Sequence, residues 1–163
     1  MSIAIRPAAL ADADFITRGN VAMALEAEHK RLEPGTVRAG VHAVLDDPGK
    51  GRYFVAEHDG RVIGQLMITY EWSDWRNGTF WWIQSVYVLP DARRRGVFQA
   101  LFSHLDQLAR ADDSVCGIRL YVERENQRAQ AAYRRCGMSD AGYDVMEVDY
   151  SDAVKAAGGP DDA

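Results

Sequence analysis

The residues with the clearest chemical potential form a turn between two apolar stretches. Three arginines precede Gly96, and the residues after it have the apolar spacing of an amphipathic helix. Glycine lets a backbone approach a ligand closely, and the first N–H groups of a helix lack intrahelical partners and lie at its positive end. This order of residues predicts a phosphate-binding turn. The N–H groups that would bind the phosphates belong to Arg93, Arg94, Arg95, Gly96, Val97 and Phe98.

A second group of polar residues follows an alternating stretch that is expected to form a strand over 117–123. It has the pattern Asn126-x-x-Ala129-x-x-x-Tyr133-x-x-x-Gly137. Asn126 is a suitable N-cap for a helix. Tyr133 carries a phenol whose ordinary pKa of about 10 keeps it protonated at pH 7, so it could act as a general acid. Packing in the core is the alternative role for its ring.

The two motifs, in this order and with a strand between them, resemble the acetyl-CoA-binding half of a GNAT-type N-acetyltransferase. The resemblance covers most of the chain in element order and is strongest from Gln84 to Met138. It implies the α/β (α+β) GNAT fold, in which a mixed, twisted sheet of about seven strands is flanked by four helices. It also implies that acetyl-CoA is the acyl donor, and that an acetyl group moves directly to a primary amine without a covalent enzyme intermediate.

The same resemblance gives roles to individual residues. The strand backbone at Tyr87 and Val88 would pair with the pantetheine arm of the cofactor, and Asn126 would hydrogen-bond to the cofactor. Tyr133 would protonate the departing sulfur. The chain departs from the family pattern at Phe98, where the motif usually ends in glycine or alanine. Phe98 keeps its N–H group, but its ring must turn into the core.

The acceptor amine must lose a proton before it can attack the thioester. An alkylamine with a pKa of about 10 is only about one thousandth neutral at pH 7, a penalty of roughly 4 kcal/mol. Diamine acetyltransferases of this family carry a glutamate on the strand before the cofactor turn, and the matching residue is Gln84. An amide cannot take the proton, although it could position a water. Glu123, at the expected end of the strand beside the turn, is the alternative base.

Aromatic residues and carboxylates are dense in the stretch 70–75, which reads Tyr-Glu-Trp-Ser-Asp-Trp. Aromatic faces near carboxylates suit a cationic amine, although core packing also uses such rings. The stretch is loosely similar to the loop before the same strand in polyamine acetyltransferases. Glu26 and Glu71 are further candidate carboxylates, each of which alone is more often a solvated surface group. The residues expected to bind the acceptor are Glu28, Trp72, Asp74 and Trp75.

The predicted function is therefore acetylation of a small cationic molecule, such as a polyamine or a related diamine. The same chemistry on an amino acid, an aminoglycoside or a protein N-terminus is an alternative. A non-catalytic acyl-CoA-binding sensor is an alternative of another class, which Gln84 and Phe98 keep open. A dinucleotide-binding oxidoreductase is excluded, because G-x-G-x-x-G is absent from the strand-to-helix turn.

The composition of the whole chain is that of an ordinary globular protein. Its 163 residues suit one domain over 1–150, followed by a flexible acidic tail over 151–163. The net charge of -5 argues against general nucleic-acid binding. No apolar run is long enough to span a membrane, and the first residues lack a signal-peptide layout, so we expect a cytoplasmic protein. Homodimers are common in the family that the chain resembles, which makes a homodimer possible.

The cysteines and histidines do not have metal-binding spacing. Cys116 and Cys136 suit packing positions, and the four histidines show neither an H-x-H nor an H-E-x-x-H pattern. We therefore expect no metal.

The remaining elements must hold these residues in place. Asp59-Gly60 lies between two alternating runs and is a hairpin signal. Pro34-Gly35 separates two expected helices, the second of which would begin after Thr36 as its N-cap. Expected strands cover 2–6, 53–58, 61–70, 79–88, 117–123, 138–142 and 145–150, with a long connection over 71–78; expected helices cover about 13–30, 37–45, 96–112 and the residues that follow Asn126.

Overall fold

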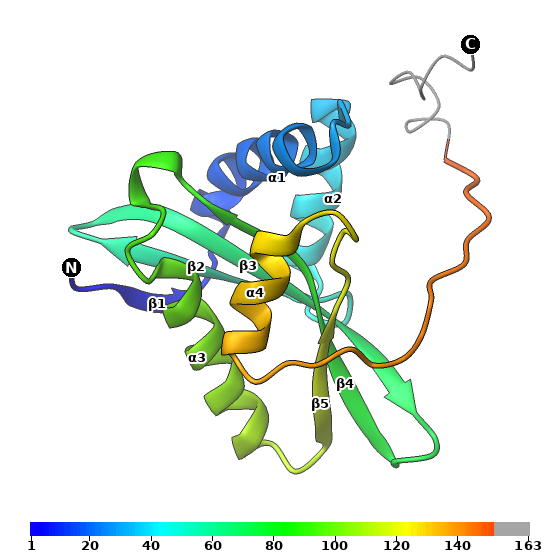
Figure 1. Ribbon diagram of the computed structural model, residues 1–163. Helices are drawn as coiled ribbons and strands as arrows, with labels where there is room; N and C mark the ends of the chain where they lie inside the picture. Colours follow the sequence, from blue (N-terminus) through cyan, green and yellow to red (C-terminus); the bar gives the residue numbers. More distant parts are fainter. Residues whose placement is uncertain (152–163) are drawn as a thin grey trace.

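The strands of the computed structural model, which describes residues 1–151, form one sheet in the order β1-β2-β3-β4-β5 (Figure 1). Strands β1 to β4 pair antiparallel, and β5 runs parallel to β4. This mixed sheet with four α-helices confirms the predicted fold class. The elements are β1 (Ala4–Pro7), α1 (Ala13–Glu28), α2 (Pro34–Asp46), β2 (Arg52–His58), β3 (Arg61–Ser73), β4 (Gly78–Val88), α3 (Val97–Ala111), β5 (Val115–Leu120) and α4 (Gln127–Arg135), with short 3-10 turns at Leu10–Asp12 and Pro90–Ala92.

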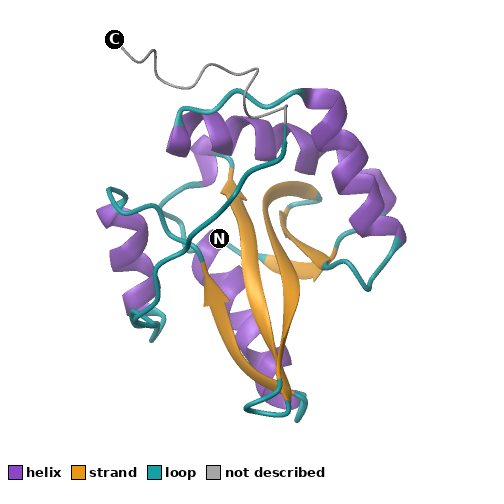
Figure 2. Ribbon diagram, turned by 90° about the vertical axis from the view of Figure 1, so that its right-hand side faces the viewer, coloured by secondary structure: helices purple, strands orange, loops and turns teal. Residues whose placement is uncertain are grey.

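The sheet has five strands rather than about seven, because the strands expected over 138–142 and 145–150 are not formed. In Figure 2 the chain after α4 crosses in front of the strands without joining any of them. An alternating sequence identifies a segment that suits a strand, but the segment becomes a strand only where a neighbour offers free N–H and C=O groups. The predicted tail beyond Ser151 lies outside the described residues.

The core has two layers because β2 is buried on both faces. Tyr53 and Val55 pack with α1 and α2, whereas Phe54 and Ala56 pack with α3. Successive side chains of a strand point to opposite faces, so one apolar strand serves both layers. The buried stripe of α3 consists of Val97, Leu101, Phe102, Leu105 and Ala109. Within residues 1–151, no helix has both the length and the apolar character of a membrane span.

The two hairpins differ in how well the sequence predicts them. Asp59 and Gly60 both have positive φ, at 51° and 75°, as the tight turn predicted between β2 and β3 requires. The long connection predicted over 71–78 is wrong, because β3 continues to Ser73 and Trp72 pairs with Thr79. Cross-strand aromatic and β-branched pairs extend this ladder to its tip.

Two element boundaries also differ from the sequence predictions. Helix α2 begins at Pro34, and Glu33 rather than Thr36 is its N-cap, since the Glu33 carboxylate accepts hydrogen bonds from Gly35 N and Thr36 N. Proline suits the first helical position, where its missing N–H would have no partner. Strand β5 ends at Leu120, so the expectation that it reaches Glu123 is wrong.

Leu105 should anchor α3, since its side chain is fully buried in the layer between α3 and the sheet. We expect Leu105→Ala to lower the free energy of unfolding by about 3 kcal/mol, measured by urea denaturation, because it removes buried methyl groups and leaves a cavity. Gln107→Ala, an exposed position on the same helix, is the control and should change stability by less than about 0.5 kcal/mol. Equal effects of the two substitutions would contradict the assigned packing of α3.

Candidate active site

The C-terminal part of β4, after Ile83, has a strand partner on one side only. Pairing with β5 covers Thr79 to Ile83, whereas pairing with β3 continues to Val88. On the β3 side Met67 faces Ser85 and the next residue faces Ile83, so Gln84 is the extra residue of a β-bulge. A bulge bends its strand, which explains why β4 and β5 separate here. The β5-facing backbone over 84–88 is left without a strand partner among the described residues.

The turn after β4 has the backbone shape expected of an anion site. Arg94 and Gly96 have positive φ, at 61° and 81°, and Gly96 is the N-cap of α3. A Cβ on Gly96 would meet no atom within 4 Å, so the conformation selects glycine and the space beside it is open. The first N–H that bonds back into α3 is that of Ala100, to Gly96 O. The N–H groups of Val97 and Phe98 therefore have no intrahelical acceptor.

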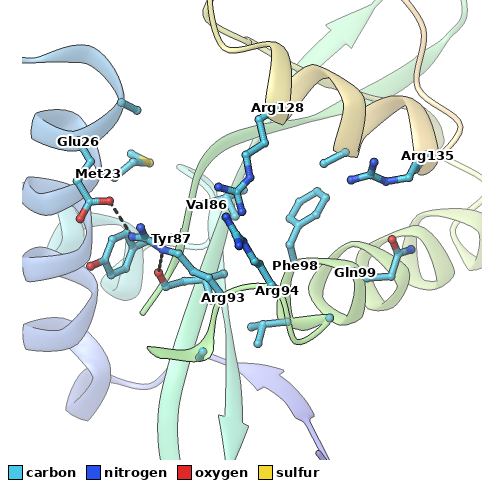
Figure 3. A pocket seen from close by; sticks show the side chains of 16 residues that line it. Met23, Glu26, Val86, Tyr87, Arg93, Arg94, Phe98, Gln99, Arg128 and Arg135 are labelled. Atoms are coloured by element: carbon cyan, nitrogen blue, oxygen red, sulfur yellow. Dashed lines mark hydrogen bonds and ion pairs between the residues drawn. The ribbon is translucent and has the colours of Figure 1, made fainter. Parts of the chain in front are cut away.

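A cavity of about 550 Å³ lies where this turn meets α1, the C-terminal end of β4 and α4 (Figure 3). Its size is within the range of small-molecule sites. It gathers most of the predicted cofactor residues in one place, but Arg95, Asn126 and Tyr133 do not line it. The lining residues are Met23, Glu26, Ala27, Val86, Tyr87, Val88, Ala92, Arg93, Arg94, Gly96, Val97, Phe98, Gln99, Arg128, Ala132 and Arg135.

Arg93 is held in the wall of this cavity by protein groups. Its Nη2 donates to Glu26 Oε2 at 2.7 Å, and its Nε donates to the Val88 carbonyl at 2.9 Å. Its guanidinium also lies 5.6 Å from the ring centroid of Tyr87. Because these contacts join α1 to the end of β4, the Arg93 side chain acts as a brace rather than as a free cation.

Three other arginines remain available to a ligand. Arg94, Arg128 and Arg135 line the cavity and form no hydrogen bond or ion pair with any residue in the described range 1–151. Figure 3 shows Arg94 and Arg128 pointing toward one another from the turn and from α4. Guanidinium groups bind phosphates strongly, so this cluster suits a ligand that carries several negative charges.

Tyr133 does not line the cavity, but its ring contacts Phe98, which does. The two rings meet edge to face with centroids 5.5 Å apart, and Phe98 also packs near Phe102. The ring of Phe98 thus turns toward α4 and the core, as the sequence requires. Burial, and to a smaller extent the neighbouring Cys136, raise the pKa of the Tyr133 phenol. Its hydroxyl therefore stays protonated at neutral pH, which a proton donor needs.

Asn126 caps α4, because its Oδ1 accepts a hydrogen bond from Ala129 N at 3.1 Å. The two candidate bases are also engaged with the protein. Gln84 is exposed, and its Nε2 donates to Thr69 Oγ1 at 2.7 Å. Glu123 lies in the loop beyond β5, and its Oε2 accepts from Glu125 N at 2.9 Å. None of these three predicted residues lines the cavity.

The residues predicted to bind the acceptor lie far from the cofactor turn. Trp72 ends β3, and Asp74 and Trp75 form the tip of the β3–β4 hairpin. At about 3.3 Å per residue, β4 places this tip roughly 30 Å from Val88. Glu28 is exposed at the end of α1 and does not line the cavity. The dense aromatic stretch therefore lies along the long hairpin and not beside the cavity.

A different aromatic group lies on the sheet face between the hairpin tip and the bulge. The rings of Trp82 and Tyr121 stack with centroids 4.4 Å apart. Trp82 Nε1 donates to Glu71 Oε2 at 3.0 Å, and Arg119 Nη1 donates to Glu71 Oε1 at 2.9 Å. The Arg119 guanidinium lies 3.7 Å from the ring centroid of Phe80. We call Glu71, Trp82, Arg119 and Tyr121 the aromatic face.

Helix α4 contributes to the cavity wall, which the sequence motifs did not predict. Arg128 and Arg135 are seven residues apart, so they lie on one face of the helix, and this spacing is a signal that could have been used. Met23 and Glu26 also line the cavity, whereas Glu28, the predicted acceptor residue on the same helix, does not. In the described part of the chain, no group of three or more His, Cys, Asp or Glu residues could hold a metal ion.

Comparisons with known proteins agree with this geometry. The model of the acetyltransferase (GNAT) family matches residues 22–138. The solved structure of a possible acetyltransferase from Clostridium difficile 630 is 42% identical, with a TM-score of 0.86, and the match covers 93% of this chain and 99% of that one. No curated protein matches the chain.

More distant solved structures share the fold. A ribosomal-protein-alanine N-acetyltransferase from Brucella melitensis biovar Abortus 2308 is 17% identical, with a TM-score of 0.72 over 91% of this chain and 100% of that one. An aminoglycoside N-acetyltransferase in complex with CoA is 15% identical, with a TM-score of 0.71 over 92% and 96% of the two chains. The family match covers most of the chain, and the chain therefore belongs to the GNAT family of acetyltransferases.

Proposed function

We propose that the cavity binds acetyl-CoA and that the enzyme transfers the acetyl group to a primary amine. The observation that carries this proposal is the cluster of three unpaired arginines around the start of α3. Arg94, Arg128 and Arg135 would bind the phosphates together with the free N–H groups of Val97 and Phe98. Such a cluster suits a ligand with a pyrophosphate and a further phosphate better than one with a single carboxylate.

The pantetheine arm would lie along the unpaired edge of β4. The backbone over 84–88 has free groups on this side, and an amide-bearing chain can add to such an edge as an extra strand. The Val88 carbonyl already accepts a hydrogen bond from Arg93, but a carbonyl oxygen has a second lone pair. This placement would bring the thioester toward the bulge at Gln84.

The acetyl transfer itself forms a bond between the amine nitrogen and the acetyl carbon and breaks the carbon–sulfur bond. The departing thiolate then needs a proton, and the amine nitrogen must lose one. We propose Tyr133 as the donor to sulfur, because its raised pKa keeps the hydroxyl protonated. For the amine, we propose a water positioned by Gln84, whose amide is oriented by Thr69. Glu123 is the second candidate base.

We propose that the acceptor is a small cationic amine of the polyamine or diamine type. The support comes from the stacked rings of Trp82 and Tyr121 on the aromatic face, because aromatic rings attract a cation. The Glu71 carboxylate beside them is already bound by Arg119 and by Trp82, so the rings themselves would contact the amine. This face replaces Trp72, Asp74 and Trp75 as the candidate acceptor surface, because those residues lie at the hairpin tip.

Removing one phosphate-binding arginine should weaken acetyl-CoA binding without unfolding the protein. We expect Arg94→Ala and Arg128→Ala each to raise the dissociation constant about tenfold, measured by isothermal titration calorimetry, because each loses a charge-assisted hydrogen bond. Arg110→Ala is the matched control, since Arg110 is exposed at the far end of α3 and pairs with Asp106. If all three variants bind alike, the cavity is not the phosphate site.

Replacement of Tyr133 tests the proposed acid. Thiol release from acetyl-CoA should depend on the added amine in a panel of polyamines, amino acids, aminoglycosides and N-terminal peptides. With the best amine, Tyr133→Phe should lower kcat tenfold or more, a barrier increase of about 1.4 kcal/mol or above, while acetyl-CoA affinity stays the same. Unchanged turnover would make Tyr133 a packing residue. Binding of acetyl-CoA without release by any amine would favour a sensor.

The pH dependence provides a separate check on the proposed acid. We expect kcat/KM for a diamine to rise between pH 7 and pH 9, since the neutral fraction of an amine with a pKa of about 10 grows about tenfold per pH unit. The pKa of Tyr133 is raised above its ordinary value, so the acid stays protonated across this range and activity should fall only above about pH 10. A fall that begins below pH 9 and is absent from Tyr133→Phe would contradict the raised pKa.

A further inference from the structure

Gln65, in the middle of β3, is a polar residue with no exposed surface. Two other buried polar residues, Asp12 and Thr17, are satisfied by an ion pair and by a hydrogen bond within α1. In contrast, Gln65 Oε1 has no hydrogen-bond partner among residues 1–151, and the same is true of the buried Ser85 Oγ. An unpaired buried polar atom costs roughly 1–3 kcal/mol, so such atoms commonly mark a bound water or a functional role.

The two oxygens come from neighbouring positions on one face of the sheet. Gln65 lies opposite Tyr87 in the β3–β4 ladder, and Ser85 lies opposite Met67. The Tyr87 ring lies against Gly19 of α1, and Met67 packs with the layer under α1 and α2. Directly opposite residues share a face, so Gln65 and Ser85 are diagonal neighbours beneath α1. Their Cα atoms should lie roughly 7–8 Å apart, which a glutamine side chain can span.

Hydrogen bonds already connect Gln65 to two other elements. Its Nε2 donates to Asn20 Oδ1 on α1 at 2.7 Å, and Asn20 Nδ2 donates to the Tyr53 hydroxyl on β2 at 3.3 Å. Burial raises the pKa of the Tyr53 phenol, and the nearby Asn20 amide and Ser85 hydroxyl partly offset that rise. Ser85 is therefore close to Tyr53, although the two hydroxyls do not have the geometry of a hydrogen bond.

The donors and acceptors of these four side chains fit a closed ring. Asn20 donates to the Tyr53 oxygen, so the phenol proton can point toward Ser85 Oγ. The Ser85 proton can then point toward Gln65 Oε1, which only accepts. Each side chain would donate once and accept once, in the order Tyr53, Ser85, Gln65 and Asn20. Hydrogen bonds in a chain of this kind polarise one another and become stronger.

We propose that Ser85 and Gln65 close this ring, by a direct hydrogen bond or through one bound water, and that the ring positions β4 for acetyl transfer. The proposal rests on the proposed function. Ser85 follows directly after the bulge at Gln84, in the stretch 84–88 whose β5 side has no strand partner. Backbone pairing holds this stretch to β3 alone, and the ring adds a connection to α1 through Asn20.

A fixed position matters at this point because the thioester would lie near Gln84 while its sulfur must reach Tyr133 on α4. A misplacement of reacting groups by about 1 Å can slow a reaction about a hundredfold. Stability alone does not explain the ring, since a well-packed apolar side chain could replace a buried amide at little cost. A satisfied polar network instead fixes one arrangement of the elements that it joins.

The kinetic test uses the fact that a ring is broken by the loss of any member. We expect Ser85→Ala and Gln65→Met each to lower kcat about tenfold with the best amine, and the double variant to lower it about tenfold rather than a hundredfold. The dissociation constant for acetyl-CoA should change less than about threefold, because the phosphate-binding arginines are untouched.

Thr17→Val is the matched control, because it removes a buried hydroxyl that lies outside the ring. It should leave kcat within about twofold of the parent. Thermal unfolding checks that every variant is folded, and Asn20→Ala takes the place of Gln65→Met if that variant does not fold. Unchanged kcat in the single variants, or losses that multiply in the double variant, would overturn the positioning role and leave the proposed function intact.

A high-resolution crystal structure of the parent tests the ring without any reference to activity. Ser85 Oγ should lie within hydrogen-bond distance of Gln65 Oε1 or of a water that is bonded to it. Side chains that point apart, with no water between them, would overturn the proposal. A parent that releases no thiol with any amine would contradict the proposed function, and a ring closed in the crystal would then have a structural role only.

Discussion

The backbone of β4 beyond Ile83 is the constraint on which the rest of this structure depends. A strand inside a sheet satisfies its N–H and C=O groups on both sides, and here one side loses its partner at the bulge around Gln84. Free groups of this kind persist only beside water or a ligand. The part of this edge at Val86 to Val88 and the free N–H groups at the start of α3 both lie in the wall of the cavity.

Packing on both faces of the sheet holds this line in position. A Cβ on Gly64 would lie 2.9 Å from Val97 Cγ1, so only glycine lets the first turn of α3 approach β3 so closely. On the other face, a Cβ on Gly19 would lie 2.9 Å from the ring of Tyr87, which lets α1 pack against the end of β4. Helices α1 and α3 are therefore fixed against the strands that border the cavity, and Arg93 also joins α1 to the end of β4 through Glu26 and Val88.

Features that depend on neighbouring residues in the sequence could be predicted, and those that depend on tertiary arrangement could not. The turn at Gly96 follows from residue types a few positions apart. The spacing of Arg128 and Arg135 indicates one face of α4, but their place in the cavity could not be deduced in this way, because it requires that α4 return over the start of α3. The location of the aromatic residues near Trp72 could not be predicted for the same reason: their types suit a cation site, but continued pairing with β4 carries them to the hairpin tip. The net charge of -5 likewise does not indicate the local cluster of charge, since three guanidinium groups without ion pairs lie around one cavity.

The segment 143–150, which forms no regular secondary structure, shows a further limit of sequence patterns. The alternation of apolar and acidic residues over 145–150 indicates which face of a strand would be apolar, but it does not indicate which strand would lie beside it. The sheet ends at β5, and β5 also supplies Arg119 to the aromatic face with Glu71 and Trp82. Any chain that pairs with β5 must border this face and help to shape it. Because β5 is the last strand of the sheet, the proposed acceptor surface at Glu71 and Trp82 lies next to an edge that has no strand partner within residues 1–151.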